Sequence, residues 1–183
     1  MEVIQKSGSR LSESLDFILA TSTPDRVKDV IEVAGIRTKA FEANPIALYM
    51  HRHDEAVGTW TNLRRNGDAL IGTLILAEAG TSRLVDFARS MIEQHILKAT
   101  SVSVQPIRST PNKNGKGRVI HESDLVEVSL VTVPMNPEAI LLAKSFEFSE
   151  AEIESILGQP TPVKCDPYLL KRASIKARMG LYR

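Results

Sequence analysis

The chain has 183 residues, of which 43% are hydrophobic and 25% are charged, close to the average of globular domains. These values argue against a largely disordered or fibrous chain, and no apolar run approaches the roughly 20 residues that a membrane-spanning helix needs. No apolar core follows the charged first ten residues, so we do not expect a secretory signal. The single cysteine, Cys165, excludes an intramolecular disulfide framework and a cysteine-rich zinc site, and it fits a reducing cytoplasm.

The net charge of +1 is distributed unevenly along the chain. Residues 161–183 carry six Lys or Arg and one acid, whereas the other 160 residues carry 17 basic and 21 acidic side chains. We therefore do not expect the body of the chain to bind nucleic acid through its charge. The basic tail is suited to an acidic surface, its own or that of a partner.

Short strands are expected in the first half of the chain. The pattern predicts a strand over 14–22, an extended run over 27–33, a helical turn over 38–43 and a short buried strand over 46–50. Two further strands, over 57–65 and 69–77, flank Asn66-Gly67-Asp68. An Asn-Gly pair between apolar runs is a strong hairpin signal.

A helix is expected over 81–98, because apolar residues recur there at i, i+3, i+4 and i+7 and Thr81 or Ser82 can cap its start. The remaining predicted elements are a strand over 99–107, a polar turn over 111–117, a strand over 125–133 ended by Pro134, and a short helix over 136–144.

Strands and helices do not alternate regularly, which predicts an α+β domain with a mainly antiparallel sheet or barrel and one central helix. We expect this domain to span residues 1–145. Residues 146–183 are expected to form a helical, basic C-terminal tail, with a linker at 158–162 and a last helix over 167–179.

Four histidines are candidates for chemistry. His51 and His53 follow a predicted buried strand, and three interpretations remain open: a polar loop, a metal site with Asp54, or a general base with an imidazole that titrates near neutral pH. His95 lies on the apolar stripe of the predicted helix and is expected to pack in the core. His121 follows the polar turn and is expected to be exposed.

Ser101 and Ser103 lie two residues apart on a predicted strand, so both point to one face. Taken alone, such serines are usually surface or half-buried hydroxyls. Glu127 lies within LVEVSLVTV, where alternation groups it with Leu125, Ser129 and Val131 on a largely buried strand. A carboxylate there needs a partner, either an arginine in a buried ion pair or a catalytic histidine that it orients.

Together, these segments resemble the tailed-bacteriophage (caudovirus) prohead maturation serine proteases, over roughly residues 14–143. The resemblance rests on five blocks in family order. They are Phe17-Ile18-Leu19-Ala20-Thr21-Ser22 with Asp25-Arg26-x-x-Asp29; Phe41-x-x-Asn44-Pro45-Ile46; Leu48-Tyr49-Met50-His51 with Val57-Gly58; Ile96-Leu97-Lys98-Ala99-Thr100-Ser101-Val102; and Leu125 to Pro134 with Asn136-Pro137-x-Ala139. The last block is the most specific.

The resemblance implies a serine endopeptidase with a fold like herpesvirus assemblin. It implies cleavage of scaffold and delta segments of the major capsid protein inside the immature shell, in the cytoplasm of a bacterial host. By position, Ser101 would be the nucleophile, His51 the base and Glu127 the third member. His51 lies six residues after Pro45 and seven before Gly58, as in the family. His53 and Ser103 are the alternates.

One position departs from the family. Ser103 stands where the pattern after the nucleophile, S-x-G-F, has glycine. A non-catalytic capsid-assembly factor that retains the protease fold is therefore a rival, as is a metal-dependent hydrolase that uses His51, His53 and Asp54. The serine-protease interpretation implies no cofactor or metal. The expected partners are the capsid protein, the scaffold and further copies of the chain, which self-cleavage or homo-oligomers would involve, without nucleic acid or membrane.

The basic tail predicts a regulatory segment, because such a protease must stay inactive until the shell encloses it. Residues 146–183 are expected to dock the enzyme in the shell or to be removed by self-cleavage, and the alternative is a plain solvated C-terminal helix. Deleting them should lower packaging into the shell or change the cleavage activity. Both quantities are measured by co-expression with the capsid protein, and a deletion that changes neither would contradict this role.

Overall fold

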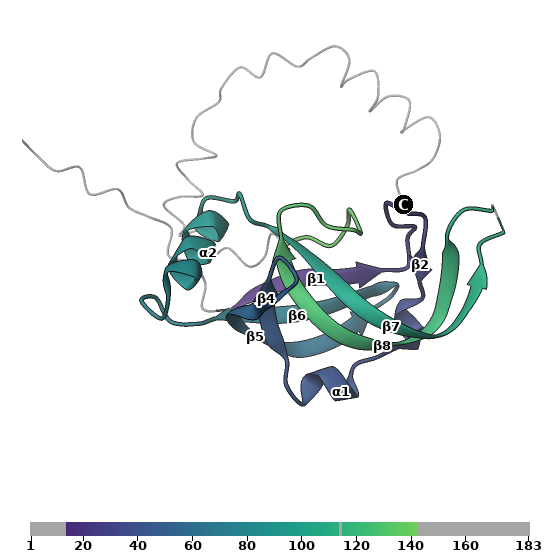
Figure 1. The fold of residues 1–183 in the computed structure, drawn as a ribbon, viewed down its shortest axis with the longest axis horizontal. Coiled ribbons are helices and arrows are strands. Elements are labelled where there is room, and N and C mark those ends of the chain that lie inside the picture. Colours follow the sequence, from purple (N-terminus) through teal and green to yellow (C-terminus); the bar gives the residue numbers. More distant parts are fainter. Residues whose placement is uncertain (1–13, 114, 143–183) are drawn as a thin grey trace, which may run out of the picture. The chain divides into compact units, whose positions relative to one another are not determined.

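A computed structural model describes residues 14–113 and 115–142, which are mainly β-structure (Figure 1). The strands are β1 (Leu15–Thr21), β2 (Val30–Ile31), β3 (Ile36–Arg37), β4 (Ile46–Tyr49), β5 (Arg52–Asn66), β6 (Ala69–Leu76), β7 (Ala99–Pro111) and β8 (Arg118–Val131). The helices are η1 (Val33–Gly35), α1 (Lys39–Glu42) and α2 (Arg83–Glu93). Within these described residues, no helix is long and apolar enough to cross a membrane.

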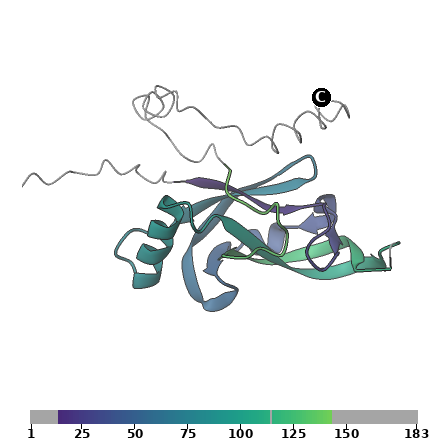
Figure 2. The same cartoon turned by 90° about the horizontal axis from the view of Figure 1, so that it is seen from above.

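All eight strands belong to one curled sheet, and the mainly antiparallel prediction is confirmed (Figure 2). The order is β1-β6-β5-β4-β8-β2, and β7 and β3 also pair with β8. The β5–β6 hairpin turns at the predicted Asn-Gly pair, where Gly67 has a φ of 56°. Gly58 of β5 is needed for close approach, because a Cβ there would lie 2.3 Å from the carbonyl oxygen of Ile75.

Strand β8 is the centre of the sheet. Its whole length pairs antiparallel with β7, and its other edge pairs in parallel with β2, β3 and β4 in turn. The local patterns at 99–107 and 125–133 predicted only parts of these two strands. β7 continues through Pro106 because it has no other strand partner in the described sheet, and proline is tolerated at a strand edge.

The short helix predicted over 136–144, after β8, was wrong. Over the described part of 136–144 the chain is not helical and runs between β1 and β7. Ile18 N–H donates to the Ile140 carbonyl at 2.9 Å, and Thr100 N–H donates to the Ala139 carbonyl at 2.9 Å. The peptide groups are satisfied by two neighbouring strands, so no helix is needed to pair them. The predicted tail, its linker and its helices lie outside the described residues.

Helix α2 is shorter than predicted and lies at one end of the sheet, not at its centre (Figure 1). Ser82 caps it as expected, because its hydroxyl accepts the Val85 N–H at 3.1 Å. The helix ends at Glu93, and His95 adopts a φ of 57° and is exposed. The core position for His95 was therefore wrong, because the chain reverses there and buries Leu97 instead.

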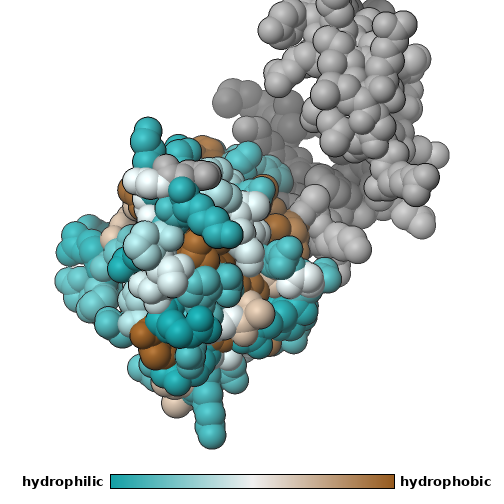
Figure 3. Space-filling view, turned by 90° about the vertical axis from the view of Figure 1, so that its right-hand side faces the viewer, coloured by the Kyte–Doolittle hydropathy of each residue, from teal (hydrophilic) through white to brown (hydrophobic). Residues whose placement is uncertain are grey.

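The core fills the concave side of the sheet. Trp60 and Phe17 are fully buried, and their rings meet edge to face with centroids 5.7 Å apart. The indole N–H of Trp60 donates to the Val128 carbonyl at 3.1 Å, so its polar atom is satisfied. This contact joins β5 to β8. The end of the molecule where β2 and the tips of β7 and β8 lie is mostly hydrophilic, with a short apolar strip (Figure 3).

A bulge in the β7–β8 pairing decides which way Glu127 points. Ser103 pairs with Glu127 and Val104 pairs with Leu125, so Val126 is an extra residue and is 54% exposed. Leu125 therefore packs in the core, and Glu127 lies on the opposite face. The expected grouping of Leu125 with Glu127 was wrong, because a bulge shifts the alternation by one residue.

Candidate active site

A two-residue loop between β4 and β5 presents His51. Tyr49 pairs with Arg52, and Met50 and His51 between them have φ angles of 53° and 60°. Two consecutive positive φ angles are typical of a tight type I′ hairpin turn, which glycine or asparagine usually occupies. Such backbone is costly for other residues, and it persists where surrounding contacts hold it. Here the Met50 N–H donates to the Leu130 carbonyl at 2.9 Å.

The Glu127 carboxylate contacts two polar side chains next to this loop. Its Oε1 is in direct hydrogen-bond contact with Nδ1 of His51, and it also accepts the Ser103 hydroxyl at 2.7 Å. Glu127 is only 6% exposed, whereas the His51 side chain is 41% exposed. The carboxylate therefore lies beneath an imidazole that solvent or a substrate can reach. The partner of this buried acid is a histidine, not the arginine of the competing interpretation.

The two candidate serines share the face of Glu127. Ser101 lies opposite Ser129, and Ser103 lies opposite Glu127, so all four side chains point the same way. Ser129 is fully buried, and its hydroxyl accepts the His51 backbone N–H at 3.2 Å. Ser101 is 7% exposed, and its hydroxyl makes no hydrogen bond with any other described residue. Ser129 thus faces Ser101 across the strand pair and contacts the backbone of His51, whose ring contacts Glu127.

His53 and Asp54 lie within β5, not in a loop as one interpretation had it. Nε2 of His53 lies 3.7 Å from Oε2 of Glu127. Asp54 instead faces Arg52 at 3.5 Å, and this hydrogen bond lowers the pKa of the Asp54 carboxyl. In the part of the chain that the structure describes, no three His, Cys, Asp or Glu are grouped as metal ligands. His51, His53 and Asp54 do not form such a group.

His121, the fourth histidine, is not part of this cluster. It lies inside β8, and its side chain is 21% exposed. Its ring nitrogens contact Glu32 at 3.0 Å and Thr110 at 2.8 Å. The expectation of an exposed residue after the polar turn was wrong, because β8 begins earlier than its apolar pattern indicated.

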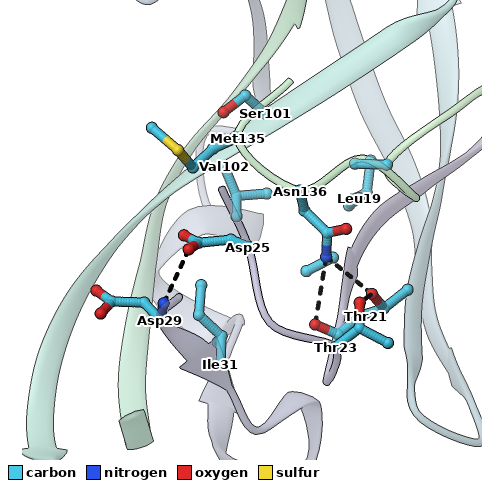
Figure 4. Close-up of a pocket in the computed structure, with 12 residues that line it drawn as sticks. Leu19, Thr21, Thr23, Asp25, Asp29, Ile31, Ser101, Val102, Met135 and Asn136 are labelled. Carbon is cyan, nitrogen blue, oxygen red and sulfur yellow. Dashed lines mark hydrogen bonds between the residues drawn. The ribbon is translucent and has the colours of Figure 1, made fainter. Parts of the chain in front are cut away.

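A small pocket of about 70 Å³ adjoins the start of β7 (Figure 4). Ser101 lies at its rim and Val102 points into it, and Asp25 and Met135 approach from the two loops that face the strand. The carboxylate of Asp25 accepts the backbone N–H of Asp29 at 2.8 Å, which holds its loop in a tight turn. The pocket is therefore lined by apolar side chains and by two acidic ones, Asp25 and Asp29, as well as by Ser101.

Two of the blocks that carry the family resemblance meet at this pocket. The Asn136 amide donates to the Thr21 hydroxyl at 2.8 Å, and Nε of Arg26 donates to the Pro134 carbonyl at 2.9 Å. The hydroxyl of Thr21 also donates to Glu138 at 2.8 Å. Residues far apart in the chain thus fix the loop after β8 against the end of β1, next to Ser101.

Sequence reasoning missed Ser129 as part of the site. Its alternation with Glu127 placed it on the right face, but only the pairing with Ser101 and the contact with His51 reveal its use. The positive φ angles at Met50 and His51 were also missed, because neither residue type signals a tight turn.

A family model described as caudovirus prohead serine protease matches residues 20–153. The chain belongs to this family. It is thus a member of the serine peptidases that act in bacteriophage capsid maturation, within the procapsid. A search of curated proteins gave no match, and a search of solved structures gave none either. The likeness of this prohead protease family member to assemblin therefore stays a prediction.

Replacing Ser129 by alanine tests how the His51 loop is held. The variant leaves the His51 N–H without its acceptor, so we expect a loss of about 1–2 kcal/mol in the free energy of unfolding. We also expect slower cleavage with little change in KM, because His51 is less well placed. Urea unfolding and steady-state kinetics measure the two effects. Unchanged stability together with unchanged kcat would show that the Ser129 contact does not hold the loop.

Proposed function

We propose that this prohead protease is an active serine endopeptidase that cleaves scaffold or delta segments of the major capsid protein inside the immature shell. Ser101 is the nucleophile, His51 the general base and Glu127 the residue that orients His51. The observation that carries the proposal is the contact of His51 Nδ1 with the buried carboxylate of Glu127, on the face that Ser101 shares. An imidazole oriented by a buried acid next to a serine is the arrangement that acyl transfer requires.

In the proposed reaction, Ser101 Oγ attacks the carbonyl carbon of the scissile peptide bond while Nε2 of His51 accepts the hydroxyl proton. The tetrahedral intermediate collapses, the C–N bond breaks and His51 returns the proton to the leaving amine. Water then enters, loses a proton to the same nitrogen and attacks the acyl-enzyme, which releases the acid and restores Ser101. Glu127 stays ionised and stabilises the imidazolium in both halves.

Nδ1 of His51 contacts Glu127, so Nε2 is the ring nitrogen that can act on the serine and the substrate. Ser103 donates its hydroxyl proton to Glu127, so this hydroxyl is held at the carboxylate. Ser101 lies two residues along β7, beside Ser129, and its hydroxyl is not held by another described side chain. These contacts support Ser101 in preference to Ser103 as the nucleophile.

Co-expression of the full chain with its cognate capsid protein tests this function, with the products read by intact mass. We expect shortened capsid protein, and we expect the cleavage to persist in the presence of a strong chelator. Loss of cleavage on chelation would favour the metal-dependent hydrolase that uses His51, His53 and Asp54. The structure gives that rival little support, because Asp54 pairs with Arg52.

A non-catalytic assembly factor is the second candidate, and Ser103 is the feature that favours it. Its side chain stands where the family pattern has glycine, and its hydroxyl occupies one side of the Glu127 carboxylate. If shells form and depend on the chain but the capsid protein keeps its full mass, the assembly factor replaces the protease as the better interpretation. Shells that form equally well without the chain would contradict only the assembly factor, because the proposed protease acts inside a shell that has already formed.

A further inference from the structure

The two oxygens of the Glu127 carboxylate have unequal surroundings. Oε1 accepts the Ser103 hydroxyl and contacts Nδ1 of His51, whereas Oε2 is buried and has no hydrogen bond with any described residue. A buried carboxylate oxygen without a donor is costly, because it has lost water without gaining a replacement. The site is therefore incomplete on the Oε2 side.

His53 has the nearest nitrogen to fill that gap. Its Nε2 lies 3.7 Å from Oε2 of Glu127, and its side chain is 81% exposed. A normal N–H···O hydrogen bond is about 2.9 Å long, so a movement of roughly 1 Å would complete it. Few contacts restrain an exposed side chain, and β5 fixes the backbone from which it moves.

The other polar groups near His53 are engaged elsewhere. The Arg52 guanidinium is shared between Asp54 at 3.5 Å and Glu55 at 3.3 Å. Asp54 and Glu55 are acids and cannot donate a hydrogen bond to Glu127 when ionised. Ser103 and His51 already use Oε1. Among the described Lys, Arg and His side chains, only His51 and His53 have a nitrogen within ion-pair distance of Glu127, and that of His53 lies nearest to Oε2.

We propose that His53 is a positioning residue that donates its Nε2–H to Oε2 of Glu127 and so keeps Oε1 aligned on His51. The inference rests on the proposed function, because its effect on catalysis passes through Glu127 and His51. A neutral imidazole with its proton on Nε2 is sufficient for this hydrogen bond, so the role does not require a charged His53. The carboxylate is then held by three side chains from β5, β7 and the β4–β5 loop.

Steady-state kinetics on the cognate capsid protein test the proposal with two substitutions. His53→Leu removes the donor, and we expect kcat to fall about tenfold with KM nearly unchanged, as for the loss of one hydrogen bond to a charged group. His53→Gln keeps an amide N–H at nearly the position of Nε2, so we expect it to retain most of the activity. Asp54→Asn is the matched control on the same strand and should resemble the wild type.

A change in KM with kcat unchanged would overturn the positioning role. Equal losses of kcat for His53→Leu and His53→Gln would also overturn it. So would full activity in His53→Leu. If His53 works through Glu127, its substitution should add almost nothing in a Glu127→Gln background, because the residues then act as a unit. Independent, multiplying losses would show that His53 acts elsewhere.

NMR of the histidine ring nitrogens separates failure of this inference from failure of the proposed function, because it needs no activity. In the full chain, Glu127→Gln should shift the His53 Nε2 resonance and leave that of His121, which contacts Glu32, unchanged. If the chemical shift of His53 Nε2 is the same in the wild type and in folded Glu127→Gln, the hydrogen bond is refuted. A shifted resonance in a chain that cleaves nothing supports the hydrogen bond and refutes only the protease.

Discussion

Replacing Ser101 by alanine is expected to lower kcat for capsid-protein cleavage by roughly a millionfold, the loss typical of a removed serine nucleophile. The alanine has no oxygen to form the acyl-enzyme, and Ser103 on the same face already donates its hydroxyl proton to Glu127. The site is otherwise left intact, because Ser101 donates no hydrogen bond to a described residue. The variant should therefore fold like the wild type.

Ser103→Ala is the matched control on the same strand and the same face. It removes one hydrogen bond to Oε1 of Glu127, so we expect a loss in kcat of no more than about tenfold. Intact mass of co-expressed capsid protein measures both variants, and a serine-directed fluorophosphonate shows which residue is labelled. Abolished cleavage in Ser103→Ala with activity in Ser101→Ala would exchange the two roles.

Glu127→Gln is expected to lower kcat by about 10⁴-fold, as when the acid of a serine triad is replaced by its amide. The neutral amide cannot stabilise the imidazolium that forms on His51. It also presents a donor where Nδ1 needs an acceptor, which favours the wrong tautomer. The loss should be smaller than that of Ser101→Ala, because the nucleophile remains.

Glu122→Gln is the control for Glu127→Gln, because both acids lie on β8 and Glu122 pairs with Arg37 at the surface. We expect Glu122→Gln to cleave at the wild-type rate. Thermal unfolding of both variants shows whether a lost rate reflects lost structure. Wild-type turnover by folded Glu127→Gln would remove Glu127 from the mechanism and leave a serine–histidine pair.

Local signals in the sequence predicted much of the fold. The Asn-Gly pair predicted the β5–β6 hairpin, and the apolar run before His51 predicted the strand β4 that ends beside it. Alternation placed Ser101 and Ser103 on one face, as the structure confirms. These features depend on neighbours within a few residues, so a short window of sequence contains their cause.

Long-range pairing explains what local patterns missed. The Asn-Pro start at 136 is a good helix signal, but the chain makes only a single turn there, and from Ala139 on it finds hydrogen-bond partners in β1 and β7. The same competition lengthens β7 and β8, which pair with each other well beyond their apolar cores. A backbone group takes the partner that the fold brings to it, and no local window reveals that partner.

The sequence by itself determined the family of this protein, because five short blocks in one chain order are readable without a structure, and it singled out Ser101, His51 and Glu127 as candidates. Only the tertiary structure decided how these residues meet. The bulge at Val126 turns Glu127 away from the core, and the tight Met50-His51 turn sets the imidazole over it. Both depend on contacts between strands that are distant in sequence, since a shift of one residue in pairing would turn Glu127 to the other face.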